Sequence, residues 1–221
     1  MNNNLTKRFI SSLIILPIAL LFIANGSLFF IFFLTILFLI TSYEWVKMSK
    51  KKILYKILGI IFLILSFYSA FHLRRYAGLN FFLFIILISI FTDIGGYIFG
   101  KFFKGPKLTK ISPNKTYSGV IGSLIMPVFA GLLYIKNIQL PLGVNVPIKL
   151  DTLNNNFDLT ILIMILTISI ISQLGDLTIS YFKRLSKIKD TGKILPGHGG
   201  LLDRVDGLIF VIPISYLFTV L

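Results

Sequence analysis

The sequence contains no cysteine, so neither disulfide bonds nor thiolate chemistry contributes to this protein. It is also poor in charge, because only 14% of its residues are charged, whereas an average soluble domain has about 25%. Acidic residues are scarcest, with 8 Asp and Glu against 22 Lys and Arg. A chain of 221 residues that is 56% hydrophobic cannot hide so much apolar surface in one soluble core. Together these features exclude an ordinary water-facing fold and predict that lipid surrounds most of the chain.

Apolar runs divide the chain into candidate membrane-spanning helices, each of which needs roughly 20 residues. The runs are Phe9–Ala24, Leu28–Tyr43, Ile53–Phe71, Leu79–Gly100, Val120–Leu140, Leu159–Leu174 and Leu208–Leu221. The first run follows Lys7 and Arg8 as in a signal peptide, but a second run follows almost at once, which favours a retained anchor. The predicted fold class is therefore all-α, a polytopic helical membrane protein with about seven transmembrane helices.

No internal repeat and no Gly/Ser-rich or Pro-rich linker interrupts this pattern. The whole chain, 1–221, is therefore predicted to be one integral-membrane domain. Residues 1–91 supply the N-terminal helices, and 92–221 form the part that carries the chemistry.

The basic residues indicate the orientation of the helices. With the N-terminus in the cytoplasm, 18 of the 22 basic residues fall in inner segments, and the outer segments keep Arg74, Arg75, Lys136 and Lys149. The positive-inside rule selects this arrangement. Two polar stretches, 101–119 and 176–207, then form cytoplasm-facing catalytic loops. The pattern also predicts a multi-pass protein of a bacterial inner membrane whose basic loops meet anionic headgroups rather than nucleic acid.

The first polar stretch follows an acidic residue placed within an apolar run. Inserting a carboxylate such as Asp93 into hydrocarbon costs about 2.5 kcal/mol or more, so it normally faces a bundle interior or a watery cavity. A helix-end Asp paired with a Lys is the alternative. Downstream, Ser112, Lys115 and Thr116 flank a proline turn that can present an ammonium and backbone N–H groups to phosphate. These four residues are candidate substrate-binding residues, although a basic loop resting on lipid headgroups remains the alternative.

The second polar stretch holds half of the acidic residues of the chain, namely Asp176, Asp190, Asp203 and Asp206. Asp203 and Asp206 are three residues apart, so a helix there places both on one face. Paired carboxylates with room for water and substrate phosphates are how Mg²⁺ is usually bound. Asp176 ends the sixth predicted helix and can meet them across the bundle. Asp176, Asp203 and Asp206 are therefore the candidate metal ligands.

Cations surround those carboxylates, and a glycine-rich loop lies among them. Mixed acidic and basic residues suit phosphate-group transfer, which needs positioning and charge neutralisation rather than a covalent nucleophile. Within Pro196–Gly200 a ligand can approach the backbone closely, and His198 is either a catalytic group or a hydrogen-bonding part of the fold. The candidate catalytic residues are Lys183, Arg184, Lys189, Asp190, His198 and Arg204, and Ser180, Gly199 and Gly200 are added to the substrate-binding group.

These residues also form a recognisable signature. One pattern reads Ser180-x-x-Lys183-Arg184-x-x-x-x-Lys189-Asp190-x-Gly192 and continues to Pro196-x-His198-Gly199-Gly200-x-x-Asp203-Arg204-x-Asp206. It resembles the signature of the phosphatidate cytidylyltransferase, or CDP-diacylglycerol synthase, family. Three other segments are similar to further sequence blocks shared by that family, namely Asp93-x-Gly95-x-Tyr97, Ser112-Pro113-x-Lys115-Thr116-x-x-Gly119 and Gln173-x-Gly175-Asp176-Leu177. Gly96 stands where that family often has alanine. The resemblance covers the chain from about Thr92 to its end.

The resemblance implies an activity, in which CTP and phosphatidate give CDP-diacylglycerol and pyrophosphate for phospholipid synthesis. It implies Mg²⁺ on Asp176, Asp203 and Asp206, with K⁺ as a second cation beside it. It also implies a helical fold with a funnel-shaped cavity open to the cytosol and to lipid. The expected partners are CTP, phosphatidate and membrane lipids, with no nucleic acid, and a homodimer is left open.

Other activities are weighed against this one. A related CTP-dependent cytidylyltransferase acting on another lipid phosphate would share the motifs. A CDP-alcohol phosphotransferase would follow Asp-Gly with Ala-Arg, which is missing after Asp206-Gly207. A cation transporter would use intramembrane carboxylates near the bilayer midplane, whereas most of the charge here lies in loops and at helix ends.

Overall fold

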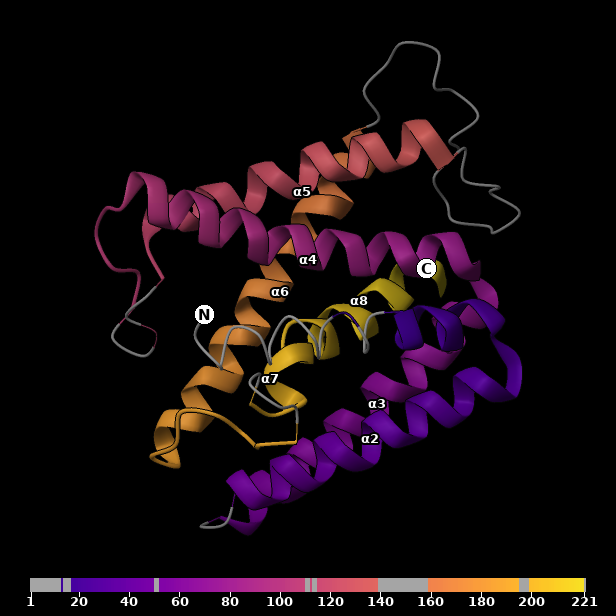
Figure 1. Ribbon diagram of the computed structural model, residues 1–221, viewed down its shortest axis with the longest axis vertical. Helices are drawn as coiled ribbons and strands as arrows, with labels where there is room; N and C mark the ends of the chain where they lie inside the picture. The colour runs from indigo at the N-terminus through magenta and orange to yellow at the C-terminus, as the bar shows by residue number, and fades with distance from the viewer. Residues whose placement is uncertain are drawn as a thin grey trace.

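The computed structural model describes residues 13, 17–49, 52–109, 112, 115–138, 159–194 and 199–220. These residues form α2 (Ser27–Met48), α3 (Ile53–Tyr76), α4 (Gly78–Phe103), α5 (Tyr117–Ile138), α6 (Leu159–Leu185), α7 (Leu202–Val205) and α8 (Leu208–Val220) (Figure 1). A further helical segment, 17–25, precedes α2. The described ranges contain no β-strand, and Lys107 and Thr116 form an isolated antiparallel bridge. The predicted all-α class is confirmed.

Five of these helices, α2 to α6, are long and apolar enough to cross a membrane, whereas α8 has 13 residues. Helix α6 continues past the predicted end at Leu174 to Leu185. The extension carries Lys183 and Arg184 in its last turn, where cations interact favourably with the helix dipole. The first predicted run, Phe9–Ala24, lies mostly outside the described residues, so the count of seven helices stays a prediction.

Helices α4 and α5 form a tightly packed antiparallel pair that lies across one side of the bundle (Figure 1). Their contact depends on glycine, because a Cβ built on Gly95 would lie 2.2 Å from the carbonyl oxygen of Gly122. A Cβ on Gly122 would likewise lie 2.3 Å from the Cβ of Phe99. Small residues at such interfaces let membrane helices approach closely. Glycines near Asp93 thus serve helix packing.

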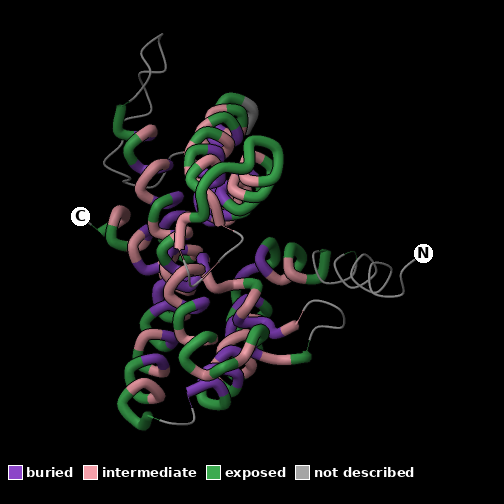
Figure 2. The backbone as a smooth tube through the Cα atoms, turned by 90° about the vertical axis from the view of Figure 1, so that its left-hand side faces the viewer, coloured by how far each residue is buried: buried purple, intermediate pink, exposed green. Residues whose placement is uncertain are grey.

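The other helices complete the bundle around a shared core. Helix α3 packs against α2 and α8, and α6 packs against α4, α5 and α8. Phe84, Ile88 and Ile165 are fully buried where α4 meets α6. Figure 2 shows buried residues along the inner faces of the helices and exposed ones on their outer faces. Large apolar side chains such as Phe32 and Leu65 are on those outer faces, as expected where lipid is the solvent.

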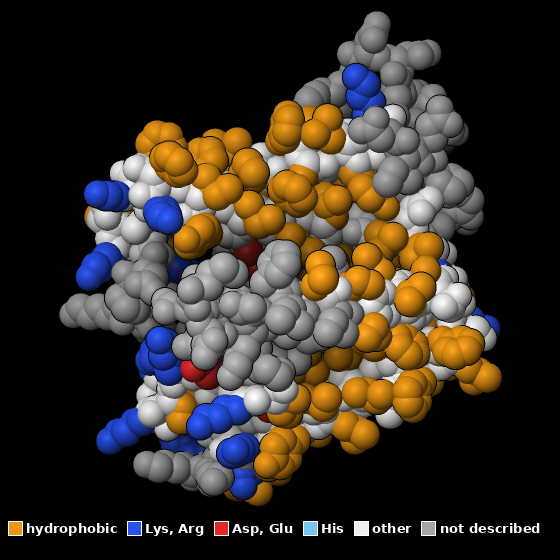
Figure 3. Space-filling model, viewed as in Figure 1, with side chains coloured by type: hydrophobic (Ala, Val, Ile, Leu, Met, Phe, Trp, Pro, Cys, Tyr) orange, Lys and Arg blue, Asp and Glu red, His pale blue; other side chains and the backbone are white. Residues whose placement is uncertain are grey.

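Charge is concentrated at one end of the bundle. Lys and Arg side chains gather on the left side of the view in Figure 3, and apolar side chains are spread over the described surface to the right of them. The basic end is built from the C-terminal turns of α2, α4 and α6, which carry Lys47, Lys101, Lys183 and Arg184.

Candidate functional site

Three carboxylates, Asp93 on α4, Asp176 on α6 and Asp206 at the junction of α7 with α8, lie near enough for their charges to interact. The register of α4 against α6 is set by a buried hydrogen bond of 2.9 Å between the hydroxyls of Ser89 and Ser172. Asp93 and Asp176 each follow one of these serines by four residues. Since residues i and i+4 share a helix face, the serine pair brings the two carboxylates to the same level. We call Asp93, Asp176 and Asp206 the carboxylate site.

Glycine at two positions allows α7 and α8 to approach α6. A Cβ on Gly175 would lie 2.9 Å from the backbone oxygen of Asp206 and 2.7 Å from the ring of Phe210. A Cβ on Gly207 would lie 2.5 Å from the hydroxyl of Ser172. Because Asp176 follows Gly175 and Asp206 precedes Gly207, the two close approaches place these carboxylates next to each other.

This close approach predicts the effect of a single methyl group. Gly175→Ala is expected to push α7 and α8 away from α6, at a cost of about 1–3 kcal/mol in the free energy of unfolding. Gly96→Ala is the matched control, because its Cβ would meet Ser123 at an ordinary 3.6 Å. Thermal unfolding of the detergent-solubilised variants measures both. Equal stability of Gly175→Ala and Gly96→Ala would contradict the packing described here.

Negative charge in the carboxylate site is only partly neutralised by the protein. The ammonium of Lys115 lies 2.6 Å from Asp176 Oδ2, and the hydroxyl of Ser180 donates to Asp176 Oδ1 at 3.3 Å. Burial raises the pKa of the Asp206 carboxyl well above its ordinary value, the charge of Asp176 raises it further, and Lys183 opposes both. A further cation in the site would favour the ionised form of Asp206.

Asp203 has a different environment from the carboxylate site. Its Oδ1 accepts a hydrogen bond of 2.9 Å from the ammonium of Lys183. Its Oδ2 accepts from the backbone N–H and the hydroxyl of Thr191, at 2.8 and 3.0 Å, and from the N–H of Gly200 at 3.1 Å. Burial raises the pKa of Asp203, but these hydrogen bonds and the charge of Lys183 outweigh it, so the pKa lies below its ordinary value. Asp203 thus ties together the two arms of the loop that precedes α7.

Glu44 is a functional candidate that the sequence reasoning missed. It lies on α2, is 1% exposed, and accepts hydrogen bonds from the N–H groups of Leu201 and Leu202 at 3.1 and 2.8 Å. The hydroxyl of Thr191 lies 3.1 Å from Glu44 Oε2 and 3.0 Å from Asp203 Oδ2, so its single proton is shared between the two carboxylates. The Glu44 carboxylate of α2 therefore holds both arms of the loop that precedes α7, one at Thr191 and the other at Leu201 and Leu202. The signal was available, since an ionisable residue closing an apolar run indicates function by default, and Glu44 is the single glutamate of the chain.

The loop between α4 and α5 uses its hydroxyls mainly within the fold. Thr116 Oγ1 accepts a hydrogen bond of 3.1 Å from the N–H of Gly119, which makes Thr116 the N-cap of α5. The N–H of Ser112 donates to the hydroxyl of Thr109 at 3.2 Å, and its backbone oxygen accepts from Lys115 at 3.1 Å. These bonds present Lys115 to Asp176. Lys115 is thus the residue of this loop that the structure places in the carboxylate site.

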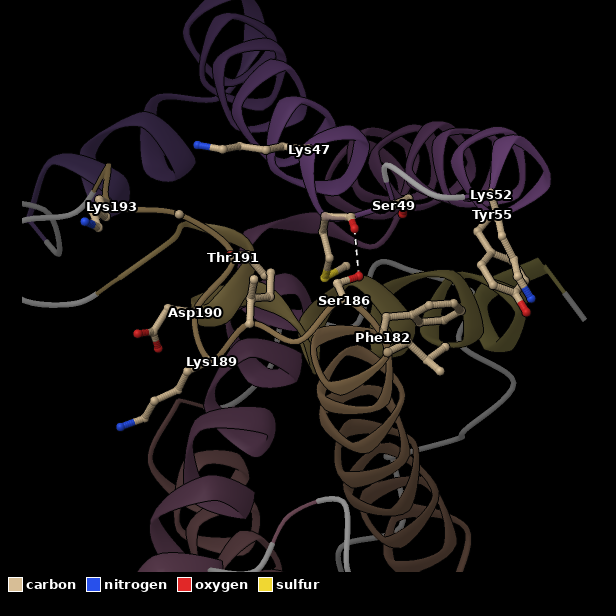
Figure 4. Close-up of a pocket in the computed structure, with 14 residues that line it drawn as sticks. Lys47, Ser49, Lys52, Tyr55, Phe182, Ser186, Lys189, Asp190, Thr191 and Lys193 are labelled. Atoms are coloured by element: carbon tan, nitrogen blue, oxygen red, sulfur yellow. Dashed lines mark hydrogen bonds between the residues drawn. The ribbon is translucent and has the colours of Figure 1, made fainter.

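Lys189 and Asp190 line a separate cavity of about 770 Å³ at the basic end (Figure 4). Residues around the turn between α2 and α3 form its other wall, with Lys47, Lys52 and Tyr55 among them. The hydroxyl of Ser186 closes the seam between α6 and α2 by donating to the backbone oxygen of Met48 at 2.7 Å. In Figure 4 the Asp190 and Lys189 side chains point away from this seam. The sequence predicted both residues to be catalytic. It did not predict that they would line a cavity separate from the carboxylate site.

The remaining candidates divide by position. Gly199 has a φ of +87°, and a Cβ there would lie 3.4 Å from Asp203 Oδ2, so both Gly199 and Gly200 pack against the Asp203 carboxylate. Arg184 and Arg204 are exposed at the end of α6 and in α7. His198 lies outside the described residues, so its role stays a prediction.

The residues of the carboxylate site suit a divalent cation that also binds phosphate. In the part of the chain that the structure describes, no three Asp, Glu, His or Cys side chains are close enough to surround one metal ion. Mg²⁺, however, usually takes one or two protein carboxylates and completes its shell with water and substrate phosphates. Asp176 and Asp206 can supply such a pair. Burial and the charge of Asp176 raise the pKa of Asp206, and a bound cation would oppose both effects. Asp203 could join them only by losing hydrogen bonds that it now accepts from Lys183, Thr191 and Gly200.

Comparison with known proteins shows where the chain belongs. A sequence model of the cytidylyltransferase family matches residues 50–221. The phosphatidate cytidylyltransferase of Brucella suis is 44% identical over 138 residues, which cover 62% of this chain and 45% of that protein. The enzyme of the same name from Staphylococcus haemolyticus is 41% identical over 145 residues, covering 65% and 50%.

A third relative aligns along almost the whole chain. The phosphatidate cytidylyltransferase of Rickettsia felis is 33% identical over 224 residues, covering 99% of this chain and 93% of that protein. The chain spans about half the length of the first curated relatives it matches. The protein belongs to the cytidylyltransferase family, and the expected family resemblance is confirmed.

Proposed function

We propose that this protein transfers CMP from CTP to phosphatidate, which gives CDP-diacylglycerol and pyrophosphate. The observation that carries the proposal is the carboxylate site with its two lysines, Lys115 and Lys183, at the basic end of an apolar helical bundle. Membership of the cytidylyltransferase family and relatives named phosphatidate cytidylyltransferase support the substrates. The site joins a water-soluble nucleotide to a lipid, so it must be open to both phases.

The orientation follows from the charge of the two ends. We place the basic end in the cytoplasm of a bacterial inner membrane, because positive residues are retained on that side. The C-terminal turns of α2, α4 and α6 would then meet both CTP and the anionic headgroups of the inner leaflet.

The reaction needs one bond to form and one to break. An oxygen of the phosphatidate phosphate attacks the α-phosphorus of CTP, the bond to the bridging α–β oxygen breaks, and pyrophosphate leaves with the electron pair. The attacking phosphate is already anionic, so no strong general base is required. In this proposal Lys183 and Arg184 would stabilise phosphate oxygens during transfer, and Lys115 would exchange its bond with Asp176 for a bond to phosphate.

Asp176 and Asp206, with Asp93 beside them, would hold Mg²⁺, which supplies charge neutralisation and orients the triphosphate when bound. Asp203 acts in this proposal chiefly as an anchor for the loop, because its four hydrogen bonds stabilise its present position. The K⁺ site and the homodimer stay predictions.

The proposal is tested with the purified full chain in mixed micelles. Phosphatidate, an ether-linked isoprenoid lipid phosphate and a lipid without phosphate are each offered with labelled CTP and Mg²⁺. Label is expected to enter the organic phase with phosphatidate and to depend on its phosphate. Faster turnover of the ether-linked lipid would instead assign the related cytidylyltransferase activity. Ion flux into proteoliposomes without CTP, together with no labelled lipid, would overturn the proposal.

A further inference from the structure

A second cavity lies between the N-terminal helices and the end of the chain. It has a volume of about 380 Å³ and is lined almost wholly by apolar side chains from residues 19–23, α2, α3, α4 and α8. Among the described residues that line it, Arg204 is the single charged one. We call this cavity the apolar groove.

The turn of α7 separates the apolar groove from the carboxylate site. Leu201, Arg204, Val205 and Leu208 line the groove and recur at the spacing of one helix face. Asp203 and Asp206 lie on the other face of the same turn. A group held at Arg204 is therefore within one helix diameter, about 10 Å, of the carboxylate site.

Aromatic side chains from the first turns of α2 and α4 line the groove away from Arg204. Phe30 and Phe82 meet edge to face, with their ring centroids 5.5 Å apart, and they are 2% and 4% exposed. Ala70, which is 2% exposed, lines the groove from α3. The groove thus has a cation on one side, an apolar wall, and Phe30, Ala70 and Phe82 on the side away from that cation.

We propose that the apolar groove holds an acyl chain of the lipid substrate, with its phosphate at Arg204, and that Ala70, Phe30 and Phe82 set the accepted chain length. The inference rests on the proposed function and adds the residues that select phosphatidates by the length of their acyl chains. The occupant follows from the chemistry of the lining, since an apolar groove within the hydrocarbon layer excludes water and a cation on one side of it recognises phosphate. Its position beside α7 brings that phosphate to the carboxylates.

Two substitutions change the side of the groove away from Arg204 in opposite directions. Ala70→Phe fills that side, so kcat/KM for long-chain phosphatidate is expected to fall about tenfold relative to short-chain phosphatidate, as overpacking by a ring costs at least about 1.4 kcal/mol. Phe82→Ala opens it and is expected to favour longer chains. Ala130→Phe makes the same change at a buried site on α5 outside the groove, and is expected to keep the wild-type chain-length profile. An unchanged profile in folded Ala70→Phe and Phe82→Ala would overturn the inference.

A binding measurement separates this inference from the proposed reaction and also covers variants that fold poorly. Wild-type protein without CTP is irradiated with phosphatidate that carries a photoreactive group at the end of one acyl chain. Crosslinks are expected around Phe30, Ala70 and Phe82, and excess unlabelled phosphatidate should suppress them more strongly than diacylglycerol does. Crosslinks spread over the outer faces of the bundle would overturn the groove even if CTP turnover is normal. Crosslinks at the groove without any CTP turnover would uphold the lipid site and refute the proposed reaction.

Discussion

Replacing Asp206 with asparagine is expected to lower kcat/KM for lipid cytidylylation by on the order of 10² to 10³. The substitution keeps the size of the side chain but removes a charge that faces Asp176 at the junction of α7 and α8. An amide binds Mg²⁺ more weakly than a carboxylate does, so the concentration of Mg²⁺ needed for half-maximal rate should also rise. Initial rates measured over a Mg²⁺ titration test both effects.

Asp158→Asn is the control for Asp206→Asn, because it removes the same charge just before α6 begins, eighteen residues before Asp176 in the chain. That variant should retain the wild-type rate and Mg²⁺ dependence. A comparison with Asp203→Asn separates the two roles assigned to the pair. Asp203→Asn should lower the unfolding temperature together with the rate, since it weakens the bonds from Lys183, Thr191 and Gly200. If Asp206→Asn left the Mg²⁺ requirement unchanged, the carboxylate site would not be the metal site.

Replacing Glu44 with leucine is expected to destabilise the protein by about 3–5 kcal/mol and to abolish most activity. The change leaves the buried N–H groups of Leu201 and Leu202 without this acceptor, and each unpaired group costs about 1–3 kcal/mol. The hydroxyl of Thr191 loses its contact with Glu44 but keeps Asp203 as an acceptor. Glu44→Gln keeps one carbonyl acceptor and should lose less. Thermal unfolding in detergent and CTP turnover measure the two effects.

Thr41→Val provides the matched control on the same helix. Thr41 is fully buried one turn before Glu44, and its hydroxyl donates to the backbone oxygens of Leu37 and Phe38 within α2. Its replacement should change stability and rate little. Comparable losses in Thr41→Val and Glu44→Leu would show that general burial in α2, rather than the bond to the loop, controls activity.

The helices could be predicted closely from the sequence because apolar length is a strong signal in a membrane protein. Helix ends were less predictable, since Lys183 and Arg184 continue α6 beyond the last apolar residue of the predicted span. Hydropathy marks where lipid begins, whereas the helix itself ends where backbone hydrogen bonding ends. Which helices meet was not predicted, because that depends on close approaches such as those at Gly95 and Gly175.

Spacing along the chain predicted Asp176, Asp203 and Asp206 as one group of metal ligands, and that role stays a prediction. The structure places Asp206 next to Asp176, whereas Asp203 bonds to Lys183 and the loop backbone. The spacing of residues in the sequence indicates which side chains share one face of a helix. It does not indicate which other element packs against that face. The sequence likewise gave no sign that Thr116 caps α5 or that Glu44 reaches the loop across 157 residues.

One isotope experiment tests the central claim most directly. The purified chain is incubated with phosphatidate, Mg²⁺ and CTP labelled either at the α-phosphorus or at the γ-phosphorus. Label from the α-position should appear in CDP-diacylglycerol, and label from the γ-position should appear only in pyrophosphate. Label from the γ-position in the lipid, or no labelled lipid from either CTP, would contradict the assignment of cytidylyl transfer to this protein.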